Sequence, residues 1–407
     1  MKSLIRKKCL CCNNGNLKEI INLGSHSFAD RFIPKNKLKI KDPQYPLILD
    51  LCVNCKYVQS RHITNPKNRY VSIDYSYTSS NSNYSKNHWI DFANDLENKI
   101  KLQNKKIIEI GSNDGTFLSN FKKTKINVFG FEPSRNVAEV SKKKGINTIN
   151  NFFNFENTKK LKKLKNNVQI ISAANAICHV PNLISLIKGV DFLLSKKGLF
   201  IFEEPYLGSM FEKASYDQIY DEHIFMFSLS SIKKIFNLYN FELIDAIPQK
   251  THGGSMRYVV GRKKIHKKTK RLNKLLLNEK RKNIDNYKGC LNFKKKCEDS
   301  KRKLISKVKK FKKNNLKIAG YAATSKSTTI LNYCKIGSNY IDYICDTTKE
   351  KIGKYSPGMH IPIVNMNYFK KNLPDKAFLF AWNHKREIFK KEKNFTNQKK
   401  WFAHIKI

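Results

Sequence analysis

Hydrophobic and polar positions follow two periods along the middle of the chain. Short apolar runs bounded by glycine or charged residues alternate with segments in which apolar residues recur every three or four positions. The first pattern is typical of buried strands and the second of amphipathic helices. The expected segments are 105–121 (strand, glycine turn and helix), 126–133, 168–180 and 198–206 (strands), and 135–145 and 182–194 (helices). Such alternation predicts a parallel sheet that is covered on both faces.

Two further regions extend this α/β pattern. The segments 241–249 and 255–262 are expected to close the sheet as an antiparallel pair. Residues 262–313 are rich in lysine and carry apolar residues at helical spacing, which predicts long helices between domains. A second alternation of strands and helices runs from 316 to 407 and predicts a smaller C-terminal α/β domain.

Cysteine spacing marks the N-terminal region as a metal site. Of the ten cysteines, Cys9, Cys12, Cys52 and Cys55 form two Cys-x-x-Cys pairs, and Cys11 is a spare. Each pair has the spacing at which a tight turn presents two thiolates to one ion. We expect a structural Zn²⁺ site, because four protein sulfurs leave no open position for water.

The charge of the chain raises the question of a nucleic-acid partner. Lys and Arg number 79 against 32 Asp and Glu, for a formal net charge of +47 in 407 residues. Clustered basic residues bind phosphates, but only eleven of the basic residues are Arg, and the lysines are spread over almost every segment. We therefore expect no nucleic-acid partner. The positive field could still help to gather a phosphorylated small substrate.

Hydropathy bears on the location of the chain. No run of eighteen apolar residues is present, and the start "MKSLIRKKCLCC" lacks the apolar region and cleavage site of a signal peptide. We expect a cytoplasmic protein without a membrane partner, and a monomer or weak homo-oligomer.

The motif "EIGSNDGTF" carries the first chemical signal. It places Gly111 where the backbone can approach a ligand closely, with Asn113 and Asp114 at the carboxyl end of a strand. The next strand ends in Glu132, which is positioned for a bidentate contact to a ribose diol, and is followed by Pro133.

Dinucleotides and S-adenosylmethionine both fit this geometry. A dinucleotide fold normally has Gly-x-Gly-x-x-Gly, and here Asn113 occupies the middle position. The carboxylates of Glu109 and Asp114 would repel a pyrophosphate and suit a sulfonium with its amino group. These features favour S-adenosylmethionine as the cofactor.

Three polar clusters are expected at the same edge of the sheet. One strand ends near Asn175 and His179, the next near Glu203 and Glu204, and the acidic, lysine-free segment "SYDQIYDEHIFMFS" (215–228) follows. The carboxyl edge is where an α/β sheet binds its ligand, so we expect these clusters to converge there. Two histidines beside a methyl donor suggest proton transfer rather than a structural hydrogen-bond cluster.

Two further motifs allow either a site or a simple turn. "HGGSMR" (252–257) is equally compatible with a hairpin and with a substrate-facing loop that includes Arg257. "GYAATSK" places Ser325 and Lys326 at a helix start, where they could contact a diphosphate or a nucleotide. An ordinary strand-to-helix turn remains the alternative for this second motif.

The motifs together resemble the sugar C-methyltransferases of deoxysugar biosynthesis, which methylate a ring carbon beside the ketone of a nucleotide-activated 4-keto-6-deoxyhexose. Beside the cysteine pairs, the resemblance is carried in the family's order over nearly the whole chain by "LGSHSFADRF", "YPLILDLCVNC", "EIGSNDGTFL", "NAICHV", "YDEHIFMFSL", "HGGSMR", "GYAATSKSTTILNYC" and "YSPGMHIPI". The chain departs from the pattern at Asp221, where many relatives have His, and at Ile352, where Gln is common.

The resemblance implies an α/β architecture and four regions. These are a zinc-binding domain at 1–70, a Rossmann-like class I methyltransferase domain at 71–262, a helical linker at 263–313, and a smaller Rossmann-like substrate-binding domain at 314–407.

The resemblance also implies a mechanism at carbon 3 of the sugar. His223 matches the family's general base, Glu222 could orient it or stabilise its imidazolium, and Tyr220 and His179 match positions that line the same pocket. Tyr77 could close over the sugar. The segment 215–228, the acidic island, would then be acidic because it holds a protonated histidine beside a cationic donor.

Two other function classes are alternatives to this one. A nucleic-acid methyltransferase is favoured by charge alone and would need a base-clamping motif that "NAICHVPN" does not supply. The other is a non-catalytic, zinc-bearing interaction protein on a methyltransferase scaffold. Such loss of catalysis is opposed by the joint presence of Glu109, Asp114, Glu132, Tyr220 and His223.

Overall fold

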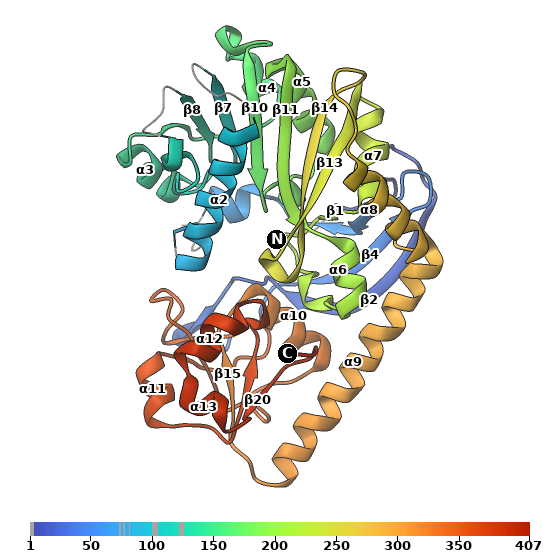
Figure 1. Ribbon diagram of the computed structural model, residues 1–407. Coiled ribbons are helices and arrows are strands. Elements are labelled where there is room, and N and C mark those ends of the chain that lie inside the picture. The colour runs from blue at the N-terminus through green and yellow to red at the C-terminus, as the bar shows by residue number, and fades with distance from the viewer. Residues whose placement is uncertain (1–3, 73–74, 76–77, 81, 100–104, 122–125) are drawn as a thin grey trace.

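A seven-stranded sheet forms the centre of the molecule in the computed structural model, which describes residues 4–72, 75, 78–80, 82–99, 105–121 and 126–407 (Figure 1). Its strands, in spatial order, are β13 (Phe241–Gln249), β14 (Ser255–Arg262), β11 (Leu194–Pro205), β10 (Val168–Ala174), β7 (Lys106–Ile110), β8 (Asn127–Phe131) and β9 (Asn147–Ile149). Strand β14 runs antiparallel to both of its neighbours. The strands β11, β10, β7, β8 and β9 run parallel, each paired with the next in this order. This is the class I methyltransferase arrangement, and the predicted antiparallel closure is present.

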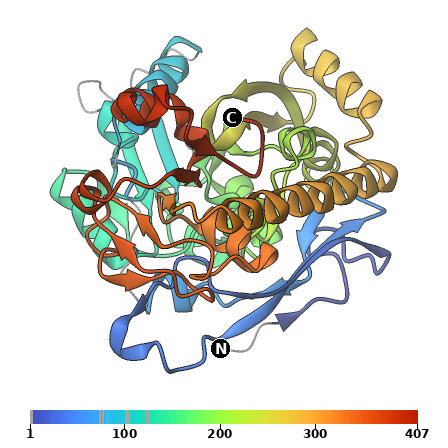
Figure 2. The same ribbon diagram turned by 90° about the horizontal axis from the view of Figure 1, so that it is seen from below.

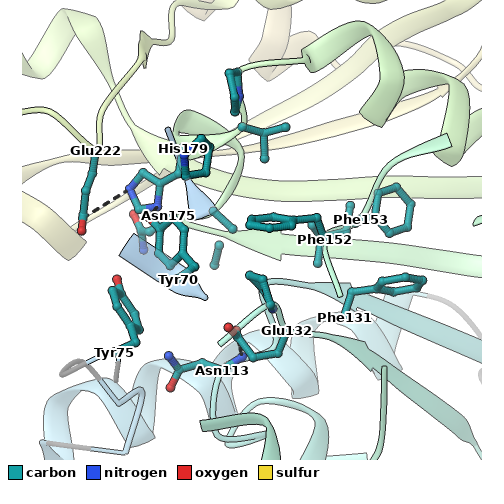
Figure 3. A pocket seen from close by; sticks show the side chains of 18 of the residues that line it. Tyr70, Tyr75, Asn113, Phe131, Glu132, Phe152, Phe153, Asn175, His179 and Glu222 are labelled. Carbon is teal, nitrogen blue, oxygen red and sulfur yellow. Dashed lines mark hydrogen bonds and ion pairs between the residues drawn. The ribbon is translucent and has the colours of Figure 1, made fainter. Parts of the chain in front are cut away.

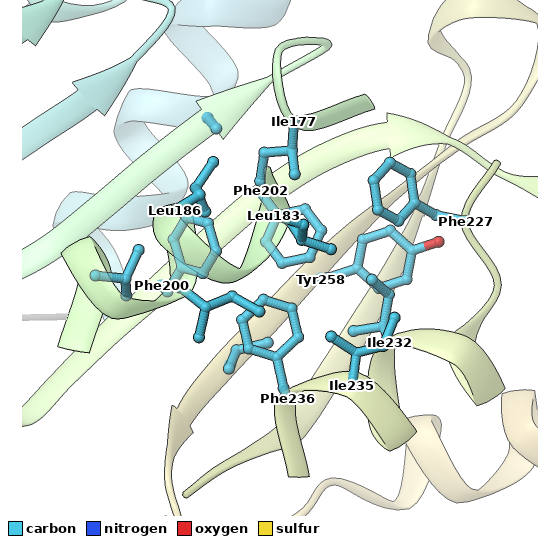
Figure 4. Close-up of a cluster of buried hydrophobic side chains, with 14 of the residues drawn as sticks. Ile177, Leu183, Leu186, Phe200, Phe202, Phe227, Ile232, Ile235, Phe236 and Tyr258 are labelled. Atoms are coloured by element: carbon cyan, nitrogen blue, oxygen red, sulfur yellow. The ribbon is translucent and has the colours of Figure 1, made fainter. Parts of the chain in front are cut away.

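Helices cover both faces of this sheet (Figure 1). They are α2 (Asn83–Lys99), α3 (Arg135–Lys143), α4 (Phe155–Lys159), α5 (Leu183–Leu193) and α7 (Leu229–Asn237), whereas α6 (Leu207–Lys213) follows β11 and packs with α9 (Tyr287–Lys313). On one face, Phe202 of β11 stacks on Tyr258 of β14 with ring centroids 5.0 Å apart, and α5 and α7 add leucine and isoleucine side chains (Figure 4). Burial of these side chains stabilises the sheet edge on which the site is built.

The helix expected after the first glycine turn is absent from the described part of that segment. Its place is taken by a short 3₁₀ turn, Leu118–Phe121. The side chain of Asn120 donates to the carbonyls of Thr116 and Phe117, both at 3.0 Å, and Ser119 Oγ donates to the Gly115 carbonyl. Side chains that bond local carbonyls compete with the helical ladder, which explains the difference.

The N-terminal region forms a four-stranded sheet that includes a strand from far along the chain. Its order is β12 (Phe225–Met226), β5 (Val58–Ser60), β4 (Gln44–Cys52) and β2 (Leu17–Ser27). The other elements here are β1 (Leu4–Ile5), β3 (Ile33–Pro34), β6 (His62–Ile63) and α1 (Lys67–Tyr70). β12 is part of the acidic island (215–228), so the island is attached to the N-terminal sheet.

The last third of the chain packs below the central sheet (Figures 1 and 2). Two helices, α8 (Lys270–Arg281) and the long α9 (Tyr287–Lys313), lead into it. A parallel sheet follows in the order β18 (Ile363–Val364), β16 (Tyr343–Cys345), β15 (Ile318–Tyr321), β19 (Lys376–Leu379) and β20 (Trp401–Phe402). Around it lie α10 (Ser325–Cys334), α11 (Met366–Lys371), α12 (Lys385–Lys391), α13 (Lys393–Asn397) and β17 (Lys354–Tyr355), which pairs with β3. None of the helices in the described ranges has the length and apolar character that crossing a membrane requires.

Candidate active site and zinc centre

The two cysteine pairs meet at one point of the N-terminal sheet. The ligand atoms of Cys9, Cys12, Cys52 and Cys55 all lie within 4.8 Å of one another. The Sγ atoms of Cys9 and Cys55 are 3.5 Å apart, and those of Cys12 and Cys52 are 3.6 Å apart. A tetrahedral zinc ion with Zn–S bonds of about 2.3 Å needs sulfurs about 3.8 Å apart, so the four thiols fit this ion. The predicted zinc site is thereby supported.

Cys11 lies beside this cluster without joining it. Its backbone N–H donates to Cys9 Sγ at 3.4 Å, which is a common way to support a metal-bound sulfur. Its own thiol is outside the group of four. The spare cysteine therefore supports the site through its main chain.

A cavity of about 590 Å³ lies at the carboxyl edge of the central sheet. Its walls come from all three parts of the chain, and Figure 3 labels ten of the side chains that line it. The predicted residues that line it are Gly111, Asn113, Glu132, Pro133, Asn175, His179, Tyr220, Glu222, His223 and Ser325. The convergence of the strand ends and the acidic island is therefore present.

One end of the cavity is formed by the turn after β7. Gly111 has φ +68° and Asn113 has φ +50°, so the backbone bends sharply against the ligand space. Glu132 fixes this turn, because its carboxylate accepts from the N–H of Asn113 at 2.9 Å and from that of Ser134 at 2.8 Å. A carboxylate has four acceptor positions, so Glu132 keeps capacity for a ribose diol.

An unpaired polar atom at this end fits S-adenosylmethionine. Among the described residues, Asn175 Oδ1 is buried without a hydrogen-bond partner. Such atoms are rare in folded proteins unless a ligand or a water completes them. Asn175 lines the cavity, where Pro133 and Phe152 add apolar surface suited to an adenine ring. The free acceptor of Asn175 and the apolar wall of the cavity therefore fit the cofactor.

Two of the predicted cofactor residues lie behind the cavity wall. Glu109 is buried, and its burial together with the charges of Asp114 and Glu132 raises its pKa well above the usual value. Asp114 forms an ion pair with Lys144 at 3.1 Å and accepts from Thr116 Oγ1 at 2.6 Å. The charge of Asp114 is thus compensated within the protein, which differs from the expectation that it faces the sulfonium.

His223 is held by a main-chain carbonyl. Its Nδ1 lies 2.7 Å from the carbonyl oxygen of Gln218, which can only accept, so Nδ1 carries the proton. The neutral ring then has its lone pair on Nε2. Burial, followed by the nearby His179, lowers the pKa of His223 well below 6.5. The ring is therefore neutral at pH 7, as a base must be before it acts.

His179 and two tyrosines surround this ring. The His179 and His223 rings are stacked with centroids 5.3 Å apart, and Tyr220 lies 3.9 Å from His223. His179 Nδ1 is 3.0 Å from the hydroxyl of Tyr70. Its Nε2 is buried without a hydrogen-bond partner among the described residues and lies 4.0 Å from Glu222 Oε2 (Figure 3). Burial lowers the pKa of His179 to about 3. This nitrogen is available to a ligand oxygen.

Glu222 does not have the orienting role that the sequence predicted. The partner that orients His223 is the Gln218 carbonyl, whereas Glu222 Oε1 accepts from Arg69 Nη1 at 2.5 Å. Asp221, the departure from the family pattern, forms an ion pair with the same arginine. The acidity of the island in the resting protein is therefore explained by anchoring to Arg69 and not by a protonated histidine.

The predicted substrate residues are divided between two places. Ser325 lines the cavity at the start of α10. Lys326 is buried beside it, with Nζ 3.2 Å from Asn383 Oδ1 and 4.8 Å from the ring centre of Trp382, and burial lowers its pKa to about 8. Arg257 is outside the cavity lining.

The guanidinium of Arg257 is used within the methyltransferase fold. It pairs with Glu203 at 2.5 Å and with Asp95 at 2.6 Å, and it stacks over Phe92. These contacts tie α2 to the central sheet. A substrate contact by Arg257 would require them to break.

Other cavity residues escaped the sequence analysis. Tyr70, Tyr75 and Asp30 come from the N-terminal region and line the cavity, and Arg69 lies directly behind it. The signal was the aromatic segment after the second cysteine pair, from which only Tyr77 was chosen. Tyr77 lies outside the described residues, so its role stays a prediction.

Comparisons with known proteins agree with this arrangement. Three family models match in succession: a zinc binding domain at 9–70, a methyltransferase domain at 83–246, and a C-methyltransferase C-terminal domain at 250–405. The C-methyltransferase NovU of Streptomyces niveus is 26% identical over 399 residues, which cover 97% of this chain and 94% of that protein.

Solved structures match less than half of the chain, at low similarity. A protein from Pyrococcus horikoshii is 17% identical with a TM-score of 0.36, over 46% of this chain and 95% of that one. Magnesium protoporphyrin IX methyltransferase from Synechocystis, with bound cofactor, is 12% identical with a TM-score of 0.33, over 44% of this chain and 79% of that one.

The activity follows from the order of the domains. The three matched models stand in the order of the zinc cluster, the seven-stranded sheet and the C-terminal sheet, and the relative aligns across all of them. The resemblance drawn from the motifs is thereby confirmed. The chain is an S-adenosylmethionine-dependent C-methyltransferase that carries a zinc-binding domain and a C-methyltransferase C-terminal domain.

Proposed function

We propose that the chain transfers a methyl group to carbon 3 of a nucleotide-activated 4-keto-6-deoxyhexose, with His223 as the base. The observation that carries this proposal is the shared cavity. The glycine turn at Gly111 and the stacked pair His179–His223 open into one space of about 590 Å³. A base and a methyl donor that share one cavity allow deprotonation and methyl transfer at the same carbon.

His223 begins the reaction in this proposal. Its Nε2 lone pair takes the proton from the carbon beside the ketone, and the electrons of the C–H bond form the enolate. The Gln218 carbonyl keeps Nδ1 protonated, so the imidazolium that forms is held in place. When bound, S-adenosylmethionine supplies the electrophilic methyl group that the enolate carbon attacks.

The enolate oxygen needs hydrogen-bond donors. His179 Nε2 is buried, lacks a partner among the described residues and faces the same cavity. The hydroxyl of Tyr220 lines this cavity too, on the ring that packs against His223. Donors that already point to the place where charge develops supply much of the stabilisation in such reactions.

The nucleotide part of the substrate is assigned to the C-terminal domain. Ser325 begins α10, whose N-terminal N–H groups favour an anion, and Lys326 adds a buried cation beside it. His252 lines the cavity from the methyltransferase side. A diphosphate between these residues would leave the sugar toward His223.

The proposal is tested by proton exchange in deuterated water. The protein is incubated with several nucleotide 4-keto-6-deoxyhexoses, with and without S-adenosylmethionine, and NMR follows loss of the carbon 3 proton and gain of a methyl group. His223→Ala is expected to abolish both. His360→Ala, which removes a partly exposed histidine bound to Asp42, serves as the control and is expected to retain both. Unchanged exchange in the His223→Ala variant would refute the base assignment.

A further inference from the structure

Arg69 inserts a cation from the N-terminal domain into the acidic island. It lies in α1, directly after the zinc-bearing sheet, and its side chain is mostly buried. It pairs with Asp221 and with Glu222 Oε1, and Asp30 Oδ2 lies 4.0 Å away. Asp221 also accepts from the N–H of Ala29 at 3.0 Å. The island is therefore bound to two separate segments of the N-terminal domain.

The same domain holds the main chain on the other side of His223. Strand β12 begins two residues after His223 and pairs with β5. The N–H of Ser60 donates to the Ile224 carbonyl at 2.7 Å, and the N–H of Ile224 donates to the Cys178 carbonyl at 2.9 Å. The base thus lies between a main-chain anchor at Ile224 and an ionic anchor at Asp221.

The charges at the ionic anchor do not balance. Three carboxylates, Asp30, Asp221 and Glu222, surround Arg69. The Glu222 side chain is 5% exposed, and its Oε2 lies 4.0 Å from His179 Nε2. A buried carboxylate stays ionised only if it is paired, so the charge of Glu222 depends on Arg69.

We propose that Arg69 is a positioning residue for catalysis, which fixes the island on the zinc-binding domain and favours the ionised form of Glu222 opposite the histidine pair. An ionised Glu222 would stabilise the imidazolium that forms when His223 takes the substrate proton. This part of the inference rests on the proposed function, whereas the effect of Arg69 on Glu222 does not.

The ionisation of Glu222 reflects opposing influences. With Arg69 present the pKa of Glu222 is raised to about 8: burial raises it, the Arg69 cation lowers it, and the carboxylates of Asp30 and Asp221 raise it. The other groups that face it are His179, which lies in the turn after β10, and the tyrosines 70, 75 and 220. Removal of Arg69 leaves burial and like charges unopposed. The pKa of Glu222 must then rise further.

The first test compares Arg69→Met with Arg61→Met. Arg61 belongs to the same domain and pairs with the buried Asp50 and with Glu19, so its variant removes a comparable ion pair. Arg69→Met is expected to lower kcat about 100-fold, as displaced catalytic groups do, with KM changed by less than about threefold. The pH dependence of kcat in this variant should also shift to higher pH by at least about one unit. The Arg61→Met profile should not shift. An unshifted profile for Arg69→Met would overturn the proposal.

A double variant separates positioning from stability. Arg69→Met leaves Asp221 buried without its cation and is expected to lower the Tm. Asp221→Asn added to Arg69→Met removes this unpaired charge and still allows the contact with Ala29. The double variant should recover much of the Tm while kcat stays low. Recovery of kcat together with the Tm would show a structural role alone and would refute the proposal.

A measurement without substrate distinguishes this proposal from the proposed function. In histidine-labelled protein, the NMR shift of His179 Nε2 should show a second step as Glu222 titrates 4.0 Å away. This step is expected to move to higher pH in Arg69→Met. If the titration step moves to higher pH but no sugar is methylated, the substrate assignment is refuted and the effect of Arg69 on Glu222 stands. If it does not move, Arg69 does not control Glu222.

Discussion

The replacement Gly111→Ala tests two reasons for glycine in the turn after β7: the positive φ and the lack of space for a Cβ atom. Gly111 has φ +68°, and an added Cβ would lie 2.7 Å from the Cβ of Ala176. Ordinary contact begins at 3.4 Å, so the turn or the Asn175–Ala176 segment must move by about 0.7 Å. Both segments line the cofactor cavity.

The expected magnitude has two parts. A left-handed conformation of a non-glycine residue costs about 1–2 kcal/mol, and overpacking costs about 1–3 kcal/mol. Together they predict a loss of about 2–5 kcal/mol in the free energy of unfolding. The affinity for S-adenosylmethionine should fall at least about tenfold, because displacing the turn is expected to cost about 1.4 kcal/mol of binding free energy or more.

The matched control is Gly24→Ala. Gly24 has φ +87°, and an added Cβ there meets nothing within 4 Å, so only the conformational part applies. Urea unfolding gives the stabilities of both variants, and isothermal titration gives the affinity for S-adenosylmethionine. Equal stability losses in the two variants, with unchanged affinity in Gly111→Ala, would refute the reasoning.

Three further predictions concern other parts of the chain. Cys52→Ser is expected to lose stoichiometric zinc, measured by elemental analysis, because three thiolates bind the ion more weakly; full retention would contradict the site. Asp217→Asn is expected to lower the free energy of unfolding by about 1–3 kcal/mol, because buried Asp217 accepts from Trp382 Nε1 at 2.7 Å and pairs with His404. Urea unfolding checks this, and a loss below about 0.5 kcal/mol would contradict it. Stability should also fall as the pH decreases from 6.5 to 4, since burial lowers the pKa of His26 to about 4 and the unfolded chain binds the proton first. This contribution is about 3 kcal/mol, and unfolding of His26→Gln should show a flatter pH dependence.

The order of elements in the central domain could be predicted from hydrophobic periodicity. Strands β10 and β11 are built around short apolar runs, Ile170–Ile171 and Leu199–Phe202, and such short runs between turn signals indicate buried strands. The first helix was predicted wrongly because periodicity does not register side chains that bond local carbonyls, as Asn120 does. The domain boundaries at 70, 262 and 313 and the cytoplasmic location stay predictions.

The candidate site was predictable where motifs end strands. Gly111, Asn113 and Glu132 follow strands β7 and β8, so their convergence follows from topology. The contacts of Arg69 were not predictable, because they join residues 152 and 153 positions apart in the chain. No local pattern distinguishes this arginine from Arg61, which serves a different ion pair.

The acidic island illustrates the same limit. Its composition was visible in the sequence, but its neighbours were not. Asp217 meets Trp382 and His404 of the C-terminal domain, and Asp221 meets Arg69 of the N-terminal domain. The carboxylates of Asp217 and Asp221 therefore connect the methyltransferase domain to the other two domains. The neutral His223 follows them in the sequence.

The pairing of β12 with β5 has a consequence for synthesis of the protein. Strand β5 leaves the ribosome long before residues 225 and 226, so its outer edge has no native partner while the central sheet is being made. An unpaired edge strand invites association with other chains. The segment that carries the base thus also covers an edge prone to aggregation, and a fragment that ends before it would be expected to self-associate.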